Sequence, residues 1–158
     1  MRFSLQARYA ICGVFDLAYN GHGEAVQVRV IGERQGIPTR YLEQIFQRLR
    51  RAGLIVGKRG PGGGYSLLRT PAELDLRSVV EAVEGPLAPF APFARDGAAD
   101  EVEEAGAAAS ANGPDFLWDE LGDRLGEVLA EVTVEDLCRR AARDAVPRTA
   151  VEGYEYQI

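Results

Sequence analysis

A glycine-rich turn between two short apolar runs restricts the fold of this chain more than any other feature of its sequence. Residues 54–56 read Leu-Ile-Val, residues 60–64 read Gly-Pro-Gly-Gly-Gly, and residues 65–68 read Tyr-Ser-Leu-Leu. Such a connection between β-prone runs predicts a β-hairpin with a glycine tip. The run does not match a nucleotide-binding loop, because Tyr65 occupies the third glycine position of GxGxxG and no Gly-Lys-Ser/Thr follows.

Helical spacing of apolar residues surrounds the hairpin. The predicted helices cover residues 4–20, 28–35, 38–52 and 76–84. Ser4 and Asp75 are expected N-caps, and glycines such as Gly36 and Gly53 are expected to end helices. The third helix has an apolar stripe, made of Leu42, Ile45, Phe46 and Leu49. Two short helices joined by a tight turn and followed by a hairpin predict a winged helix-turn-helix, mainly α with a small β-hairpin wing.

The exposed face of the third helix carries side chains suited to reading DNA. Its arginines and glutamines form bidentate pairs with guanine and adenine, and Tyr41 suits a sugar, a phosphate or a thymine methyl. Glu43 is suited to accept a hydrogen bond from a cytosine amino group. In the hairpin, Arg59 suits a narrow minor groove, and the backbone amides of residues 62–64 are expected to be free to donate to phosphate.

Charge is divided unequally along the chain. The net charge of −6 combines a net +7 over residues 1–69 with a net −13 over residues 70–158. Such asymmetry indicates that the first half meets a polyanion and the second half does not.

The chain is predicted to have four parts: a winged helix-turn-helix DNA-binding domain over 1–85, a flexible segment over 86–114, dimerisation helices over 115–145 and a tail over 146–158. Of the 29 residues in 86–114, ten are Ala, four Pro and five acidic, which leaves little apolar surface to bury. A helix from about Phe116 carries a long apolar stripe, formed by Leu117, Leu121, Leu125, Val128, Leu129 and Val132. Thr133 and Asp136 form a capping box for a last helix.

Several other classes of protein are excluded. Cys12 and Cys138 lie far apart in sequence, so we expect reduced thiols in a cytoplasmic protein. A single histidine, His22, and the absence of CxxC and HExxH argue against a zinc site. Arg8 and Asp16 interrupt any leader sequence, and no apolar run approaches the roughly 20 residues of a membrane span. No nucleophile–base pair or carboxylate dyad shares an element, so we expect no enzyme.

The chain contains two specific motifs, YLEQIF at 41–46 and RGPGGGY at 59–65. Shorter motifs occur at 1–4, 8–10, 33–37, 49–50, 53–54, 84–87 and 117–118. These residues resemble the IscR/NsrR/CymR (Rrf-type) family of winged helix-turn-helix transcription regulators, over about residues 1–138 with a gap at 88–114. The resemblance implies a homodimeric DNA-binding repressor or activator, with repressor favoured, whose long helix from Phe116 crosses its twin.

The resemblance also places DNA contacts on the third helix and the wing. The resemblance and the exposed helix face together give the predicted DNA-binding residues, which are Thr39, Arg40, Tyr41, Glu43, Gln44, Arg48, Lys58, Arg59, Gly60, Gly62, Gly63 and Gly64. The expected partners are double-stranded DNA, a second copy of the chain and an unidentified small-molecule or protein effector, with no membrane.

One departure from the family pattern concerns iron. Many members hold an iron–sulfur cluster through three cysteines before the dimerisation helix, but residues 86–117 contain no cysteine. Asp115 and Arg8 lie near non-cysteine ligand positions of some members, and one carboxylate cannot hold a cluster. Cys12 and Cys138 are expected to be core thiols, so the sequence predicts a member without a cofactor. Two alternatives stay open: a winged-helix protein-interaction module, and a cluster-sensing regulator whose cysteines were removed.

Overall fold

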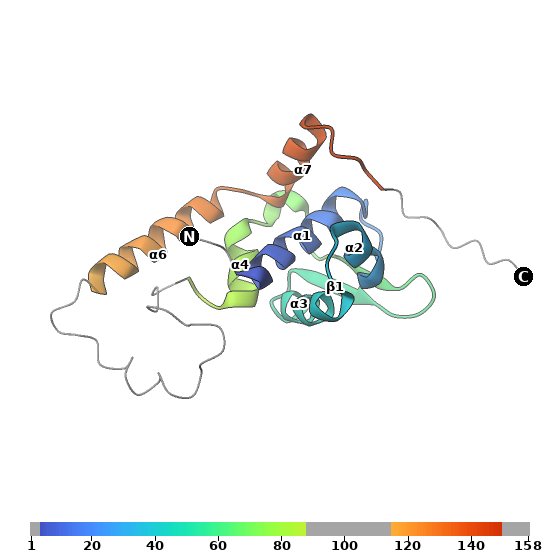
Figure 1. The fold of residues 1–158 in the computed structure, drawn as a ribbon, viewed down its shortest axis with the longest axis horizontal. Helices are drawn as coiled ribbons and strands as arrows, with labels where there is room; N and C mark the ends of the chain where they lie inside the picture. The colour runs from blue at the N-terminus through green and yellow to red at the C-terminus, as the bar shows by residue number, and fades with distance from the viewer. Residues whose placement is uncertain (1–3, 88–114, 150–158) are drawn as a thin grey trace, which may run out of the picture.

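Helices make up most of the structure, a computed structural model that describes residues 4–87 and 115–149 (Figure 1). In chain order the elements are α1 (Leu5–Tyr19), α2 (Val28–Gln35), α3 (Thr39–Arg51), β1 (Ile55–Lys58), β2 (Gly64–Leu67), the 3-10 helix η1 (Pro71–Glu73), α4 (Leu76–Glu84), α6 (Asp115–Ala130) and α7 (Val134–Arg143). The predicted mainly helical fold with a small β-hairpin is confirmed. Residues 88–114 of the predicted flexible segment, and 150–158 of the predicted tail, lie outside the described residues.

Helix α1 lies at the centre of the molecule and packs against α2, α3, α4 and α7 (Figure 1). Its N-cap is the predicted one, because Ser4 Oγ accepts a hydrogen bond from the backbone amide of Ala7 at 3.0 Å. Gly13 allows α3 to approach closely, since a Cβ there would lie 2.6 Å from the ring of Phe46. This close crossing fixes α3 against the core.

A tight turn joins α2 to α3. Gly36 ends α2 in the left-handed conformation, with φ of 64°. Pro38 is the N-cap of α3, so this helix begins one residue later than predicted. The predicted apolar stripe of α3 is fully inside the core, as Leu42, Ile45, Phe46 and Leu49 are all buried. The opposite face of α3 is therefore turned to solvent.

The two strands form an antiparallel hairpin that is closed by a tight turn. The backbone amide of Gly63 donates to the carbonyl of Gly60 at 2.8 Å. Gly62 has φ of 70°, as the third position of a type II turn requires. A further pairing was not predicted: Val26 and Tyr65 exchange two backbone hydrogen bonds of 2.9 and 2.8 Å. This bridge ties the wing to the segment before α2.

The C-terminal helices attach to the N-terminal ones. Asp75 caps α4 by accepting from the amide of Ser78 at 2.7 Å, as predicted. A backbone bridge joins Asp75 to Thr133 at the start of α7, where the predicted capping box of Thr133 and Asp136 is present. Helix α7 packs on α1, and α6 packs on α4 and extends away from the body (Figure 1).

Two local features go beyond the elements predicted from the sequence. The left-handed residues after α1 are His22 and Gly23, with φ of 50° and 86°, and they lie beyond the helix end at Asn20. The short helix η1 was not predicted, although Thr70 and Glu73 have the spacing of a capping box and form one. Hydrogen bonds from Thr70 lower the pKa of Glu73 below its usual value.

Candidate nucleic-acid interface

The exposed face of α3 begins in the first turn of the helix. Arg40, Tyr41, Glu43 and Gln44 are exposed, and Tyr41 is 58% exposed despite its size. Recognition helices contact base edges with their N-terminal residues, and these side chains occupy that end of α3. Thr39 differs, because it is half-buried.

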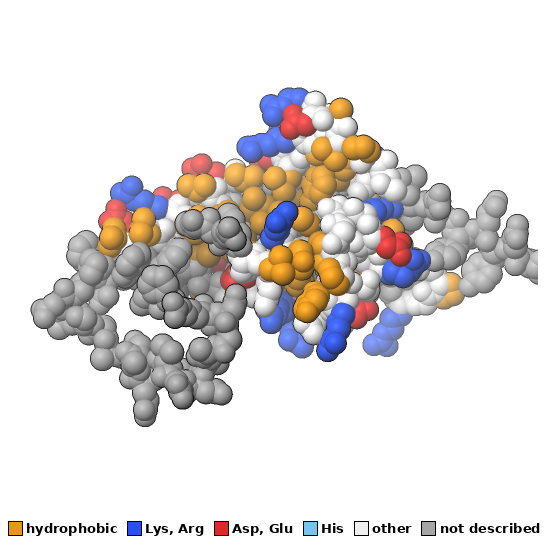
Figure 2. Space-filling view, in the orientation of Figure 1, with side chains coloured by type: hydrophobic (Ala, Val, Ile, Leu, Met, Phe, Trp, Pro, Cys, Tyr) orange, Lys and Arg blue, Asp and Glu red, His pale blue; other side chains and the backbone are white. Residues whose placement is uncertain are grey.

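The wing tip is the second part of the candidate interface. Lys58, Arg59, Gly60 and Gly62 are exposed. On the face seen in Figure 2, Lys and Arg side chains gather along the edge of the molecule formed by α3 and the hairpin. Basic groups on one edge are suited to a phosphate backbone.

The backbone amides of the wing are less available than expected from the sequence. The amide of Gly63 donates to Gly60 within the turn, so the expectation of a free amide is wrong at Gly63. Gly64 lies in β2 against Val26, where a Cβ would lie 2.4 Å from the Val26 carbonyl oxygen. Its φ of 153° adds a conformation that L side chains rarely adopt. Gly64 therefore positions the wing by allowing a close backbone approach.

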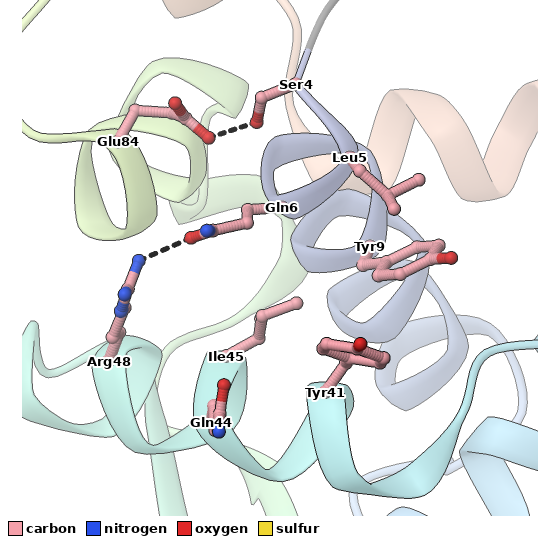
Figure 3. Close-up of a pocket in the computed structure, with 9 residues that line it drawn as sticks. All are labelled: Ser4, Leu5, Gln6, Tyr9, Tyr41, Gln44, Ile45, Arg48 and Glu84. Carbon is pink, nitrogen blue, oxygen red and sulfur yellow. Dashed lines mark hydrogen bonds between the residues drawn. The ribbon is translucent and has the colours of Figure 1, made fainter. Parts of the chain in front are cut away.

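Arg48 differs from the other predicted DNA-binding residues because its guanidinium is engaged within the protein. Its Nη1 donates to Gln6 Oε1 of α1 (Figure 3). The same Nη1 donates to the backbone carbonyl of Val83 in α4 at 2.9 Å. Beside this pair, Ser4 Oγ donates to a carboxylate oxygen of Glu84. No local sequence pattern indicates these bonds, because the partners come from two other helices.

A groove of about 280 Å³ lies between α1, α3 and the end of α4 (Figure 3). Its lining mixes apolar and polar side chains: Ser4, Leu5, Gln6, Tyr9, Tyr41, Gln44, Ile45, Arg48 and Glu84. Tyr41 and Gln44 line the groove and also lie on the exposed face of α3, so the groove opens beside that face.

A buried polar cluster joins α1 to α2, and it was not predicted from the sequence. Asp16 is fully buried and accepts hydrogen bonds from Asn20 Nδ2 at 3.0 Å, Arg34 Nη1 at 3.1 Å and Gln35 Nε2 at 2.8 Å. A buried carboxylate is tolerated when it is paired and hydrogen-bonded in this way. The available signal was an acidic residue between apolar neighbours in the central helix.

The C-terminal end of the described chain reaches the same part of α1. Tyr19 donates through its hydroxyl to the carbonyl of Val146 at 2.9 Å, and the amide of Thr149 donates to Asn20 Oδ1 at 3.0 Å. The Arg148 guanidinium carbon lies 4.6 Å from the centre of the Tyr19 ring, a cation–π contact. Residues 146–149 thus lie against the end of α1.

The predicted dimerisation stripe divides into two faces of α6. Leu129 is buried and Leu125 is half-buried, and both pack against the hydrophobic core. Leu117, Leu121 and Val128 are exposed large apolar residues, at 38%, 42% and 59%. Val132, beyond the helix end, is half-buried.

Small residues place α6 against α4. Gly122 and Gly126 are buried, and a Cβ on Gly126 would lie 3.1 Å from the guanidinium of Arg77 in α4. The packed face of α6 is therefore the one with Gly122, Gly126 and Leu129, while the exposed apolar face is left for another contact.

The cysteines do not fit an iron–sulfur cluster. Cys12 and Cys138 are half-buried on α1 and α7, and burial raises the pKa of both thiols despite the opposing charges of Arg8 and Arg148. A cluster is held by about four ligands that are mostly thiolates, whereas this chain has two cysteines, which lie on separate helices. Within residues 4–87 and 115–149, no group of three or more His, Cys, Asp or Glu side chains could hold a metal ion. In the same ranges, no helix has the length and apolar character needed to span a membrane.

Curated relatives match about half of the chain. The putative HTH-type transcriptional regulator NMA1593 of Neisseria meningitidis is 44% identical over 87 residues, which cover 55% of this chain and 59% of the relative. The HTH-type transcriptional regulator IscR of Cronobacter sakazakii is 43% identical over 84 residues, covering 53% and 52%. The chain thus spans about half the length of the curated relatives it matches. They are named as regulators, not as enzymes.

Solved structures and a family model match a larger share. T. potens IscR has a TM-score of 0.69 and 27% identity, with 94% of each chain covered. CymR (YrzC), the global cysteine regulator of B. subtilis, has a TM-score of 0.66 and 28% identity, covering 89% of this chain and 98% of that one. The Rrf2 family model, described as "Iron-dependent Transcriptional regulator", matches residues 3–140. Since this match takes in most of the sequence, the chain belongs to the Rrf2 family of transcriptional regulators.

Proposed function

We propose that this protein is a sequence-specific DNA-binding transcription regulator, a cytoplasmic repressor that acts as a homodimer on a pseudo-palindromic operator. The observation that carries the proposal is that the exposed end of α3 and the wing tip share one basic edge of the molecule (Figure 2). Arg40, Tyr41 and Gln44 offer donors and acceptors for base edges in the major groove. Arg59 on the wing is suited to the phosphate backbone or the minor groove.

The dimer is proposed to form through the exposed apolar face of α6. Leu117, Leu121 and Val128 leave large apolar surfaces in water, and burying one such side chain contributes about 1.5–3 kcal/mol. A second copy of α6 would cover this face. The two-fold symmetry of that pair would present two α3 helices to two half-sites of opposite direction.

The regulator is proposed to respond to a small-molecule or protein effector without an iron–sulfur cluster. The small number of cysteines and their position on separate helices argue against a ligand role. We therefore propose that this member shares the fold of a family described as iron-dependent but does not sense its signal through iron.

Selection of bound duplexes from a random-sequence pool tests the DNA-binding proposal. We expect the purified protein to enrich an inverted repeat whose half-site centres are separated by a multiple of about 34 Å. Its affinity for that operator should fall linearly with salt on logarithmic axes, because binding releases counterions from phosphates. Enrichment of no sequence, with no salt-dependent binding to any duplex, would favour a protein-interaction module instead.

A further inference from the structure

We propose that Arg48 is a positioning residue of the recognition helix and not a phosphate ligand: it fixes α3 to α1 and α4 and thereby sets the half-site spacing that the dimer accepts. The inference rests on the proposed function, since spacing has a meaning only for a dimer bound to two half-sites. It goes beyond that function because it assigns Arg48, one of the residues predicted to bind DNA, a structural role in place of a DNA contact.

The hydrogen bonds of Arg48 join the ends of three helices. Its Nη1 donates to Gln6 Oε1 in the first turn of α1 (Figure 3). The same Nη1 also donates to the carbonyl of Val83. Val83 lies in the last turn of α4, where carbonyls lack intrahelical partners and a cation is favoured by the helix dipole. Ser4 and Glu84 add a second bond between α1 and α4 at this junction.

Helix α4 connects this junction to the proposed dimer helix. It packs against α3 on one side and α6 on another, with Arg77 of α4 lying against Gly126 of α6. Figure 1 shows α4 between the end of α1 and the extended α6. An angle fixed between α3 and α4 is therefore also an angle between α3 and the proposed dimer axis.

The position of Arg48 along α3 suits it to orient the helix rather than to contact bases. It lies eight residues after Arg40, which is about 12 Å along a helix at 1.5 Å per residue. The reading end of α3 is thus far from the end that Arg48 anchors. Without the anchor, α3 could tilt about its buried stripe, which would move the reading end while leaving its side chains available to DNA.

Spacer-length profiles and salt dependence distinguish positioning from phosphate binding. The probe is the operator that the wild-type protein selects, with its central spacer lengthened or shortened by one and two base pairs. For Arg48→Gln we expect the affinity penalty for altered spacers to shrink several-fold, with the wild-type salt slope retained. The penalty is a ratio of two affinities of one protein preparation, so a reduced folded fraction does not change it.

Lys58→Gln is the matched control, because Lys58 is exposed on the wing and is one of the proposed DNA-binding residues. It should keep the wild-type spacer profile and lower the salt slope by about one for each phosphate that is no longer neutralised, or about two in a symmetric dimer. Gln6→Ala removes the other end of the Arg48 bond without changing charge. Because the Arg48 bond to the Val83 carbonyl remains, we expect Gln6→Ala to flatten the profile in part, and the double variant to be no flatter than Arg48→Gln alone.

Three results would overturn the inference. A reduced salt slope with an unchanged spacer profile in Arg48→Gln would make Arg48 a phosphate ligand. A flattened profile in Arg48→Gln that Gln6→Ala does not reproduce even in part, or that becomes flatter still in the double variant, would mean that the bridge to α1 does not contribute. Failure of the wild-type protein to select any operator would instead overturn the proposed function, and this inference with it.

Discussion

At the scale of single residues, Asp16 shows how a buried charge organises the DNA-binding half. Its carboxylate accepts from Arg34 and Gln35 in the last turn of α2, immediately before the turn into α3. Asn20, which also donates to Asp16, accepts from the amide of Thr149. A continuous chain of hydrogen bonds therefore runs from the C-terminal end of the described residues to the helix-turn-helix.

We expect Asp16→Ala to lower the free energy of unfolding by about 3–5 kcal/mol, because it breaks a buried ion pair from one side. Urea denaturation followed by far-UV circular dichroism measures the change. Glu24→Ala, at an exposed position in the following turn, is the control and should leave the unfolding midpoint near that of the wild type. A midpoint for Asp16→Ala equal to that of the control would show that the cluster contributes little.

Arg59 belongs to the same scale, since its side chain is exposed next to the turn of the wing. We expect Arg59→Ala to weaken operator binding by about 1–3 kcal/mol in each half-site. Titration by fluorescence anisotropy at fixed salt measures it. Arg139→Ala removes the same charge from α7, where the guanidinium pairs with Glu135, and should bind like the wild type. Equal weakening by both variants would point to net charge rather than to the wing.

At the scale of elements, α6 carries two apolar faces with different roles. We expect Leu121→Asp combined with Val128→Asp to give monomers, because each copy would place charges in an apolar interface. Sedimentation velocity at several concentrations is the measurement. Glu127→Ala, exposed on the same helix, should stay dimeric. An unchanged sedimentation coefficient in the double variant would place the dimer interface elsewhere. Leu129 is not substituted, because it is buried and a charge there would test folding instead.

The capping box of α7 gives a pH-dependent prediction. The backbone amide and then the hydroxyl of Thr133 hold the pKa of Asp136 below its usual value. The contribution of this carboxylate is therefore present above the unfolded pKa and is lost as pH falls through the lowered folded pKa. We expect Thr133→Ala to lower the Tm by a few degrees at neutral pH and by less in acid. A Tm difference that grows on acidification would contradict this assignment.

Element boundaries followed closely from local signals. The helices at 28–35 and 76–84 have the predicted bounds, because Gly36 supplies a left-handed C-cap and Asp75 an N-cap. The division of the α6 stripe did not follow from its sequence. A spacing of three and four residues covers more than a hundred degrees of helix surface. Only the burial of Gly122 and Gly126, with Gly126 lying against Arg77 of α4, shows which side is inside.

At the scale of the whole molecule, the thiols bear on how the regulator receives its signal. After anaerobic purification we expect no stoichiometric iron or acid-labile sulfide and no visible charge-transfer absorption, together with operator binding. The physical reason is ligand number, because a cluster takes about four ligands that are mostly thiolates and this chain offers only Cys12 and Cys138 on separate helices. Iron, sulfide and visible absorption are measured on one sample. Absorption that disappears when either cysteine is replaced would mean a cluster shared between subunits.

Local sequence patterns predicted the helices, the glycine turn of the wing and the separation of a basic from an acidic half. These depend on neighbours within a few residues, where caps, glycine conformations and apolar spacing act. Three features emerged from the fold: Arg48 bonds to α1 and α4, Asp16 is a buried acceptor, and half of the α6 stripe lies inside. Each of these partners is distant in sequence, so its identity depends on how the helices cross, and local patterns do not encode that geometry.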